Sequence, residues 1–301
     1  MSLISSDVRA GYWPATPLAF LARVGGAIAL LRRKPLGAFG GALVVLMLAV
    51  ALAAPLVAPY DYRDQSRTRL FKPPGAEHLM GTDNFGRDIF SRIVYGARTS
   101  LYVGLVSVGL GTGLGSLVGL VSGYAMGKVD FLLQRFMDML LAFPTLLLAI
   151  ATVAMLGPTT TNVVLAIAIV FIPTANRVVR GAVLAEKENQ YVEAARTVGC
   201  RTARIIFRHI LPNVTAPIIV IASISLGTAI LVESSLSFLG LGPPPPAPVW
   251  GGMLSTGART FFERAPWMAI FPGIAISLGV LGLNLLGDAV RDLLDPRLRG
   301  R

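Results

Sequence analysis

The feature that most constrains this chain is a series of apolar runs, each long enough to cross a lipid bilayer. The clearest run covers residues 36–58 and contains no charged residue. A helical crossing takes about 20 apolar residues, and the hydrocarbon core offers no water to pair with backbone groups. Of the 301 residues, 54% are apolar and 14% are charged, which is the balance of a membrane protein and not of a soluble domain. We therefore predict an all-α membrane protein.

Hydropathy and turn signals predict six transmembrane helices. They cover residues 36–58, 101–124, 131–156, 163–179, 214–236 and 267–287, with residues 101–290 as a five-helix core. The connecting parts are an N-terminal segment (1–35), a long loop (59–100), a polar loop (181–213), a later loop (237–266) and a tail (291–301). We expect Pro144 and Pro173 to kink the third and fourth helices, Arg135 to pair with Asp138, and Trp267 to anchor the last helix at the interface.

The distribution of basic residues predicts which loops face the cytoplasm. Six crossings put both termini on one side, and most of the 27 Lys and Arg lie in the segments that this side would hold. The positive-inside rule then gives an N-in, C-in topology with a cytoplasmic polar loop and a long outer loop after the first helix. Because the bases form short clusters between apolar runs, they do not indicate nucleic-acid binding. With 35 residues before it and enough length to span, the first run is expected to be a retained helix and not a cleaved signal.

Glycine recurs every fourth residue in the second predicted helix. Gly111, Gly115, Gly119, Gly123 and Gly127 therefore fall on one face. Without side chains there, a neighbouring helix can approach closely and gain dispersion contacts. We expect close packing on this face, the alternative being that these are glycines which a membrane helix merely tolerates.

The polar loop contains two short helical patterns. Glu193 to Val198 are good helix formers followed by Gly199 as a C-terminal cap, and Arg201 to Leu211 form a basic pattern ended by Pro212. A rigid pair of short helices at the membrane surface could pass force from a cytoplasmic partner. The alternative is a basic amphipathic loop that lies on anionic lipid.

These residues carry a family resemblance. Glu193-Ala194-Ala195, then Gly199, then Leu211-Pro212 resemble the EAA signature of permease subunits of bacterial ATP-binding-cassette importers, with His209 where an aliphatic residue is usual. The outer-loop residues His78, Gly81, Thr82, Asp83, Gly86, Arg87 and Asp88 resemble the C-type permeases of the dipeptide, oligopeptide and nickel branch. Asp138 with 141–144, the run 233–242 and the tail 292–297 are also similar to that branch.

The resemblance implies a fold, a function and partners. It implies a type I importer permease in the bacterial plasma (inner) membrane that moves di- or oligopeptides, or a related small solute such as a nickel chelate. Glu193, Ala194, Ala195, Gly199, His209, Leu211 and Pro212 would form the element that docks on an ATPase subunit. The partners would be a second homologous permease, two ATP-binding subunits that hold ATP and magnesium, an extracytoplasmic solute-binding protein and the lipid bilayer.

The chain itself is not expected to be an enzyme or to bind a cofactor. A phosphate-binding loop needs G-x-x-x-x-G-K-[ST] after a strand, and the nearest approach, at 122–129, lacks the first glycine and the final hydroxyl. His78 with Asp83 could in principle bind a metal, but a structural role in the outer loop is the expected one. A single cysteine, Cys200, excludes an internal disulfide.

One acidic residue lies in a predicted membrane helix. Glu233, with Ser234 and Ser235, would line the solute path or contact a partner subunit, since an unpaired acid in lipid is costly. The alternative is that Glu233 stays hydrated near the outer interface. A self-sufficient secondary transporter or channel is the rival function, for which Glu233 would be the candidate relay. A membrane enzyme ranks below it, because no nucleophile and base converge.

Overall fold

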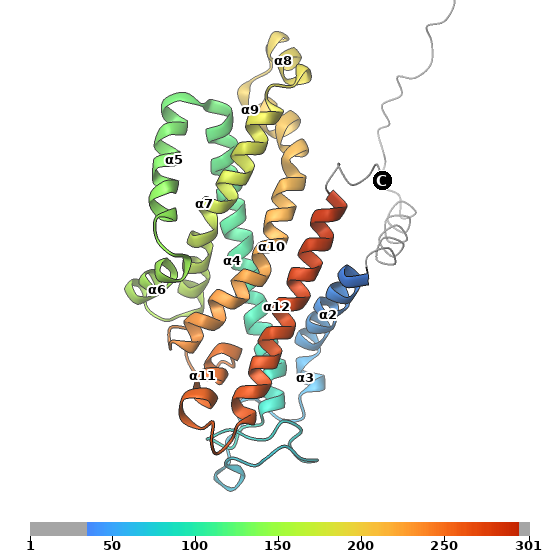
Figure 1. Cartoon of the computed structure of the whole chain (residues 1–301), viewed down its shortest axis with the longest axis vertical. Helices are drawn as coiled ribbons and strands as arrows, with labels where there is room; N and C mark the ends of the chain where they lie inside the picture. Colours follow the sequence, from blue (N-terminus) through green and yellow to red (C-terminus); the bar gives the residue numbers. More distant parts are fainter. Residues whose placement is uncertain (1–34, 295–301) are drawn as a thin grey trace, which may run out of the picture.

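The computed structural model describes residues 35–294 as a bundle of long helices (Figure 1). In chain order these are α2 (Pro35–Leu52), α3 (Ala54–Val57), the 3₁₀ turn η1 (Arg67–Arg69), α4 (Ile89–Ala125), α5 (Gly127–Leu141), α6 (Thr145–Leu156), α7 (Thr160–Glu186), α8 (Gln190–Thr197), α9 (Thr202–Arg204), the π-helical turn η2 (Ile205–Ile210), α10 (Leu211–Phe238), α11 (Trp250–Thr260) and α12 (Trp267–Leu294). The predicted N-terminal segment, apart from Pro35, and the tail beyond residue 294 lie outside the described residues.

Helix length and hydropathy agree with a protein that crosses the membrane several times. Five stretches are long and apolar enough to span a bilayer: α2, α4, α7, residues 202–238 and α12. The pair α5–α6 adds a sixth if it counts as one broken span. Within residues 35–294 the regular structure is helical, with one isolated bridge between Thr82 and Asp88. The all-α prediction is thus confirmed.

The third span differs from the predicted continuous helix. The chain turns by 91° between α5 and α6, around residues 142–144. Pro144 has no N–H to donate, and its ring would clash with the carbonyl four residues earlier, so the helix stops and restarts after it. Pro173, in contrast, lies inside α7, which continues on both sides of it.

Two other helices are longer than hydropathy predicted. The second begins at Ile89 and not near residue 101, because the Asp88 carboxylate caps its N-terminus by accepting a hydrogen bond from the Ser91 N–H at 2.7 Å. The fourth runs from Thr160 to Glu186, since its polar last turns remain helical beyond the apolar part. Hydropathy detects the portion of a helix that suits lipid, and these ends are polar.

The most extensive helix contact in the bundle joins α4 to α7, and glycine makes it possible. A Cβ atom on Gly111 would lie 2.6 Å from the Ala168 carbonyl oxygen, and one on Gly115 would collide with the carbonyl of Ile172. Gly119 and Gly123 face the next turns of α7 in the same way. Gly127, grouped with them by its spacing, lies outside this contact: it starts α5 with φ +61° and open space around it.

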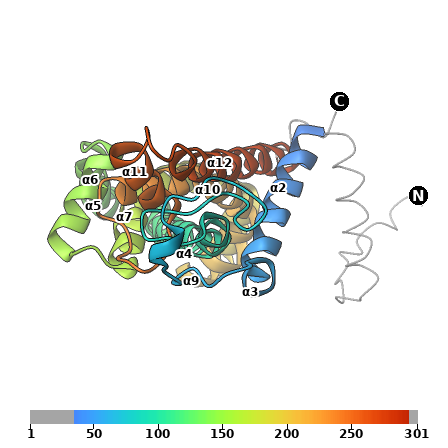
Figure 2. The same cartoon turned by 90° about the horizontal axis from the view of Figure 1, so that it is seen from below.

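The two ends of the bundle are different. We call the end that carries residues 187–210 the hairpin end, and the end that carries residues 59–88 the loop end; they lie at opposite extremes of the molecule (Figure 1). The first residue of α2 and the last described turn of α12 point toward the hairpin end. Seen from the loop end, residues 59–88 lie across the bundle (Figure 2).

The loop between α10 and α12 contains a helix that the sequence did not indicate. In α11, Gly251 and Gly257 make it a poor helix by propensity. Both glycines are in tight contacts, Gly251 against the backbone of Ser234 and Gly257 against that of Met268. The indole N–H of Trp250 donates to the Ile93 carbonyl at 3.0 Å and so ties α11 to α4. Tertiary packing therefore stabilises a segment of weak intrinsic propensity.

The glycine contact makes a direct prediction about stability. Gly115→Ala should lower the free energy of unfolding by about 1–3 kcal/mol, because the added methyl group collides with a backbone carbonyl that cannot move cheaply. Gly113→Ala, two residues away with nothing within 4 Å, is the matched control and should be neutral or slightly stabilising. Unfolding in mixed micelles titrated with SDS measures both, and equal effects would contradict the contact.

Candidate functional site

The residues of the EAA pattern form a helical hairpin at one end of the bundle. On α8 the side chains of Glu193 and Ala194 are exposed, while Val192 and Ala195 are buried. Gly199 follows with φ +77°, a conformation that an L side chain rarely adopts, and a Cβ there would meet nothing within 4 Å. Glycine is needed at this position for backbone conformation, since space is not limiting.

The inner face of the hairpin packs on the ends of α4 and α7. The buried residues of this apolar cluster are Leu120, Val179, Val183, Val192, Ala195, Ile205, Ile206, Ile210 and Val214. Each large aliphatic side chain fully buried in such a cluster contributes about 1.5–3 kcal/mol. The hairpin is therefore seated on the bundle.

The second arm of the hairpin does not stop at Pro212, contrary to prediction. Helical structure continues from Thr202 to Phe238. The transition occurs in the π-helical turn η2, where the Leu211 N–H donates to the Ile206 carbonyl. Pro212 then occupies the first turn of α10, where its missing N–H costs little. A continuous helix consequently joins the hairpin to the fifth span.

Tyr191 joins three elements at the base of the hairpin. Its hydroxyl donates to the Glu186 carboxylate at the end of α7 and accepts from the Asn213 side chain of α10 at 3.0 Å. The same Asn213 amide donates to the carbonyl of the half-buried His209 at 2.8 Å. Partial burial raises the pKa of the Tyr191 hydroxyl, and the bond to Glu186 acts in the same direction. The Tyr191 hydroxyl therefore stays protonated and can donate its hydrogen bond to Glu186.

The outer face of the hairpin combines apolar and charged side chains. Val198 is 76% exposed and Phe207 is 57% exposed, in the same hairpin as the exposed Glu193 and Ala194. Arg196, Arg201, Arg204 and Arg208 are exposed as well. Exposed apolar groups rimmed by charges are typical of a surface that a partner protein covers.

A ladder of polar pairs joins α5 to α7. Asp130 and Gln134, four residues apart on α5, bind Arg180 and Asn176 of α7. The Arg180 guanidinium donates two hydrogen bonds to Asp130, at 2.7 and 2.6 Å, and the Asn176 amide donates to Gln134 at 3.0 Å. The i, i+4 spacing of polar residues was a signal for this ladder that sequence reasoning did not use.

Asp138 continues the ladder, which corrects a predicted pair. Its carboxylate accepts a hydrogen bond from Arg177 of α7 at 3.3 Å, while Arg135 lies over the ring of Phe131 at 5.0 Å. The expected Arg135–Asp138 pair is therefore replaced by a contact between helices. Both Asp138 and Arg177 are exposed, so this rung is weaker than the Asp130–Arg180 rung.

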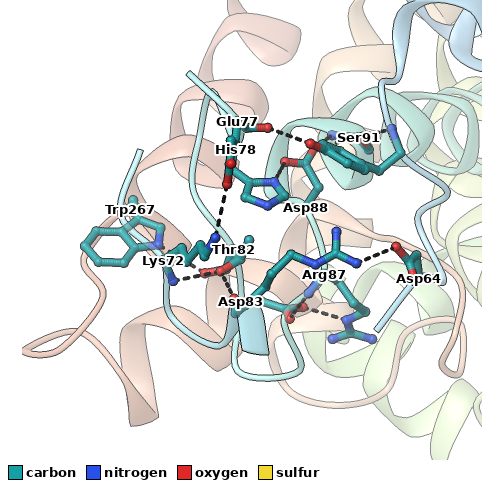
Figure 3. A network of polar contacts seen from close by, with 12 residues as sticks. Asp64, Lys72, Glu77, His78, Thr82, Asp83, Arg87, Asp88, Ser91 and Trp267 are labelled. Atoms are coloured by element: carbon teal, nitrogen blue, oxygen red, sulfur yellow. Dashed lines mark hydrogen bonds and ion pairs between the residues drawn. The ribbon is translucent and has the colours of Figure 1, made fainter. Parts of the chain in front are cut away.

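At the loop end, Asp83 and Asp88 of the same loop pair with different basic residues (Figure 3). Asp83 accepts a hydrogen bond from Arg87 at 2.6 Å and lies 3.9 Å from Arg92. Asp88 contacts the His78 ring at 2.9 Å and also caps α4. His78 is thus paired with Asp88 and not with Asp83, and no group of three His, Cys, Asp or Glu within residues 35–294 could hold a metal ion.

The same loop is fixed to the start of α12. The indole N–H of Trp267 donates to the Thr82 carbonyl at 3.1 Å (Figure 3). Gly81 and Gly86 have φ +75° and +73°, and a Cβ on Gly86 would collide with the Ser66 carbonyl. These contacts brace the outer-loop motif against α4 and α12.

Glu233 lies inside the bundle, at the contact between α10 and α4. Its side chain is fully buried, and its carboxylate accepts hydrogen bonds from Ser237 at 2.7 Å, Ser100 at 3.2 Å and Ser234 at 3.5 Å. Ser235 instead donates to the Leu231 carbonyl of its own helix. Three hydroxyl donors satisfy the acid without a cation, so in this structure Glu233 joins two helices and does not reach a surface.

Comparison with known proteins shows similarity along most of the chain. Residues 115–300 match the binding-protein-dependent transport system inner membrane component, and residues 25–74 match the N-terminal TM domain of oligopeptide transport permease C. The dipeptide transport system permease protein DppC of Alkalihalophilus pseudofirmus is 46% identical over 89% of this chain and 88% of its own length.

Two further relatives show the same degree of similarity. The di/tripeptide transport system permease protein DppC of Pseudomonas aeruginosa is 48% identical over 87% of this chain and 89% of its own length. The glutathione transport system permease protein GsiD of Pectobacterium atrosepticum is 46% identical over 89% of each chain.

The α5–α7 ladder predicts an energetic coupling between two residues. A double-mutant cycle on Asp130→Ala and Arg180→Ala should give an interaction energy of about 0.5–3 kcal/mol, because the pair is bidentate and partly buried. The same cycle on Arg135→Ala and Arg180→Ala is the control and should be additive. Additivity in both cycles, measured by SDS unfolding, would remove the ladder as a stabilising contact.

Proposed function

The chain belongs to the family of binding-protein-dependent transport system inner membrane components, and on that premise we propose that it is a permease subunit of an ATP-driven peptide importer. The observation that carries the proposal is the hairpin: its inner face, which includes Ala195, is fixed to the bundle, and its outer face presents Glu193 and Ala194 of the EAA pattern for a partner. The names of the relatives, which concern dipeptides, di/tripeptides and glutathione, support a short peptide as the solute.

The proposed topology places the hairpin end in the cytoplasm of a bacterial cell. The basic residues of the hairpin support this orientation through the positive-inside rule. The loop end would then face outward, and both termini would be cytoplasmic. The position of the hairpin and the long loop at opposite ends of the bundle is in keeping with this topology (Figure 1).

In the proposed complex the chain lines part of the solute path and transmits the movement of the ATPase subunits to its transmembrane helices. Two ATP-binding subunits hold ATP and magnesium, and one of them grips the hairpin through Glu193, Ala194 and the neighbouring apolar groups. A second homologous permease completes the path, and an extracytoplasmic binding protein delivers the solute. The chain carries no cofactor and performs no bond-breaking step.

Two connections leave the hairpin and a third extends from α7, and together they would transmit the movement of the hairpin. The apolar cluster joins the hairpin to α7, and the glycine contact joins α7 to α4. The ladder from Arg180 to Asp130 connects α7 with α5. The continuous helix through Pro212 connects the hairpin with α10. Closure of the ATPase pair would therefore move several spans together, as rocking between inward-open and outward-open forms requires.

The rival secondary transporter would use Glu233 as an ion or proton relay. The hydrogen bonds of this carboxylate go to three serines, and within the described residues no basic side chain or second acid bonds to it. These contacts support a structural role between α4 and α10. Uptake by this chain alone in liposomes, driven by an ion gradient, would favour the rival.

The proposal predicts that hairpin variants separate ATP hydrolysis from uptake. Glu193→Arg changes an exposed side chain, so the chain should still insert, but reversing its charge should lower peptide uptake about tenfold, as loss of about 1.4 kcal/mol of binding would. Gly199→Val should act similarly, because it strains a position with φ +77°.

The control is Glu263→Arg, the same change of an exposed acid beyond α11 at the loop end. It should leave the ratio of peptide transported to ATP hydrolysed unchanged in proteoliposomes that contain the whole complex. An unchanged ratio for Glu193→Arg and Gly199→Val would refute the coupling role.

A further inference from the structure

A cavity of about 620 Å³ lies at the loop end, away from the hairpin and its connections. Its walls come from parts distant in sequence: the outer-loop motif, the first turn of α4, the end of α10, the segment of four prolines, α11 and the start of α12. The volume lies within the range of about 300–1,000 Å³ typical of sites for small molecules. None of the roles proposed above uses this space.

The cavity wall includes a hydrogen-bond acceptor that has no donor. Asn84 lines the cavity, and its side-chain oxygen Oδ1 is buried without a hydrogen-bond partner in the described part of the chain. Buried polar atoms are nearly always paired, because leaving one unpaired is costly. The oxygen is screened from the cavity as well as from water in this arrangement, so a rotation of the Asn84 side chain is needed to present it to an amide N–H of a bound molecule.

The charged groups of the wall have a surplus of positive charge. Arg87, Arg92 and Asp83 all line the cavity, and their side chains are 12%, 7% and 8% exposed. Asp83 is the single acid among the lining residues, so one carboxylate faces two guanidinium groups. A further carboxylate is the natural partner of such a pair, since guanidinium groups bind it through two parallel hydrogen bonds.

The remaining wall is largely apolar. Pro243 to Pro246 form one side, and Phe85, Met253 and Met268 add further apolar surface. At the base, Ser237 lines the cavity while it donates its hydroxyl to Glu233 at 2.7 Å, which fixes this part of the wall to the bundle. Rigid proline and adaptable methionine together suit an apolar side chain of variable shape.

We propose that this cavity is a binding site for the carboxyl-terminal part of a short peptide. The free carboxylate binds the guanidinium groups of Arg87 and Arg92, a peptide N–H donates to Asn84, and the last side chain lies against the prolines and methionines. This inference rests on the proposed function, which supplies the peptide as solute. It adds a site at the loop end where the solute is held before it enters the bundle.

Cysteine protection in the whole transport complex tests the site. Thr256 lines the cavity from α11 and is exposed, so Thr256→Cys provides a thiol at its edge. Thr260→Cys, one turn further on α11, is exposed but does not line the cavity and is the matched control. Maleimide labelling is quantified at each site by mass spectrometry, with the native Cys200 of the hairpin as internal reference.

The dipeptide alanyl-phenylalanine should slow labelling of Thr256→Cys several-fold and leave Thr260→Cys and Cys200 unaffected. Its carboxyl-terminal amide, which lacks the anionic group, should protect weakly, and Asn84→Leu should abolish protection by the free dipeptide. The assay is run first without the extracytoplasmic binding protein.

Equal protection by the dipeptide and its amide would overturn the proposed site, as would an absence of protection. Protection that needs the binding protein would also overturn it, and would make the cavity a contact for that protein. ATP-driven uptake of the same dipeptide by the wild-type complex separates the two proposals. Uptake without protection refutes the cavity site alone, whereas absence of uptake refutes the proposed function.

Discussion

The close contact between α4 and α7 is the constraint on which the rest of the structure depends. In lipid there is no hydrophobic force between helices, so they associate through dispersion contacts and hydrogen bonds at short range. Four glycines on α4 let its backbone approach α7 where any side chain would collide. The position of α7 in turn determines where the hairpin packs, because Val179 and Val183 belong to the apolar cluster below the hairpin. It also positions α5, because Arg180 of α7 pairs with Asp130 of α5.

Polar groups inside the bundle are placed where another helix can satisfy them. Glu233 is enclosed by serine hydroxyls of α4 and α10, and Asn176 is paired across to Gln134 of α5. Such groups are expensive in lipid unless they are paired, so their partners define which helices must be neighbours. The α5–α6 break interrupts the helix within a pair that is apolar and long enough to count as one span, and in lipid such a break is tolerated only where protein or water covers it.

Much of this arrangement could be predicted from the sequence because it depends on local patterns. Apolar length predicted the spans, and the period of four predicted the face of α4 that packs on α7. The turn at Gly199 also follows from local helix signals, whereas α8 begins at Gln190, three residues before the predicted start at Glu193. These features depend on a few neighbouring residues, whose effects are independent of the rest of the chain.

The features that could not be predicted depend on contacts between distant residues. Asp138 could have paired along its own helix with Arg135, but α7 brings Arg177 within reach. Pro212 predicts the end of a helix, but a π-helical turn before it allows the helix to continue. The cavity at the loop end is built from five separate parts of the chain, at residues 65, 83–92, 158, 237–256 and 268, and no spacing within one of them indicates it.

The central claim is that the hairpin and the α4–α7 pair move as one rigid unit. Spin labels on Gln190 at the start of α8 and on Leu117 of α4, both exposed, report the distance between the two parts by pulsed electron resonance. In the assembled transporter this distance distribution should be the same without nucleotide and with trapped ATP. A shift or a second peak on ATP binding would show that the hairpin moves independently of the bundle and would contradict the account.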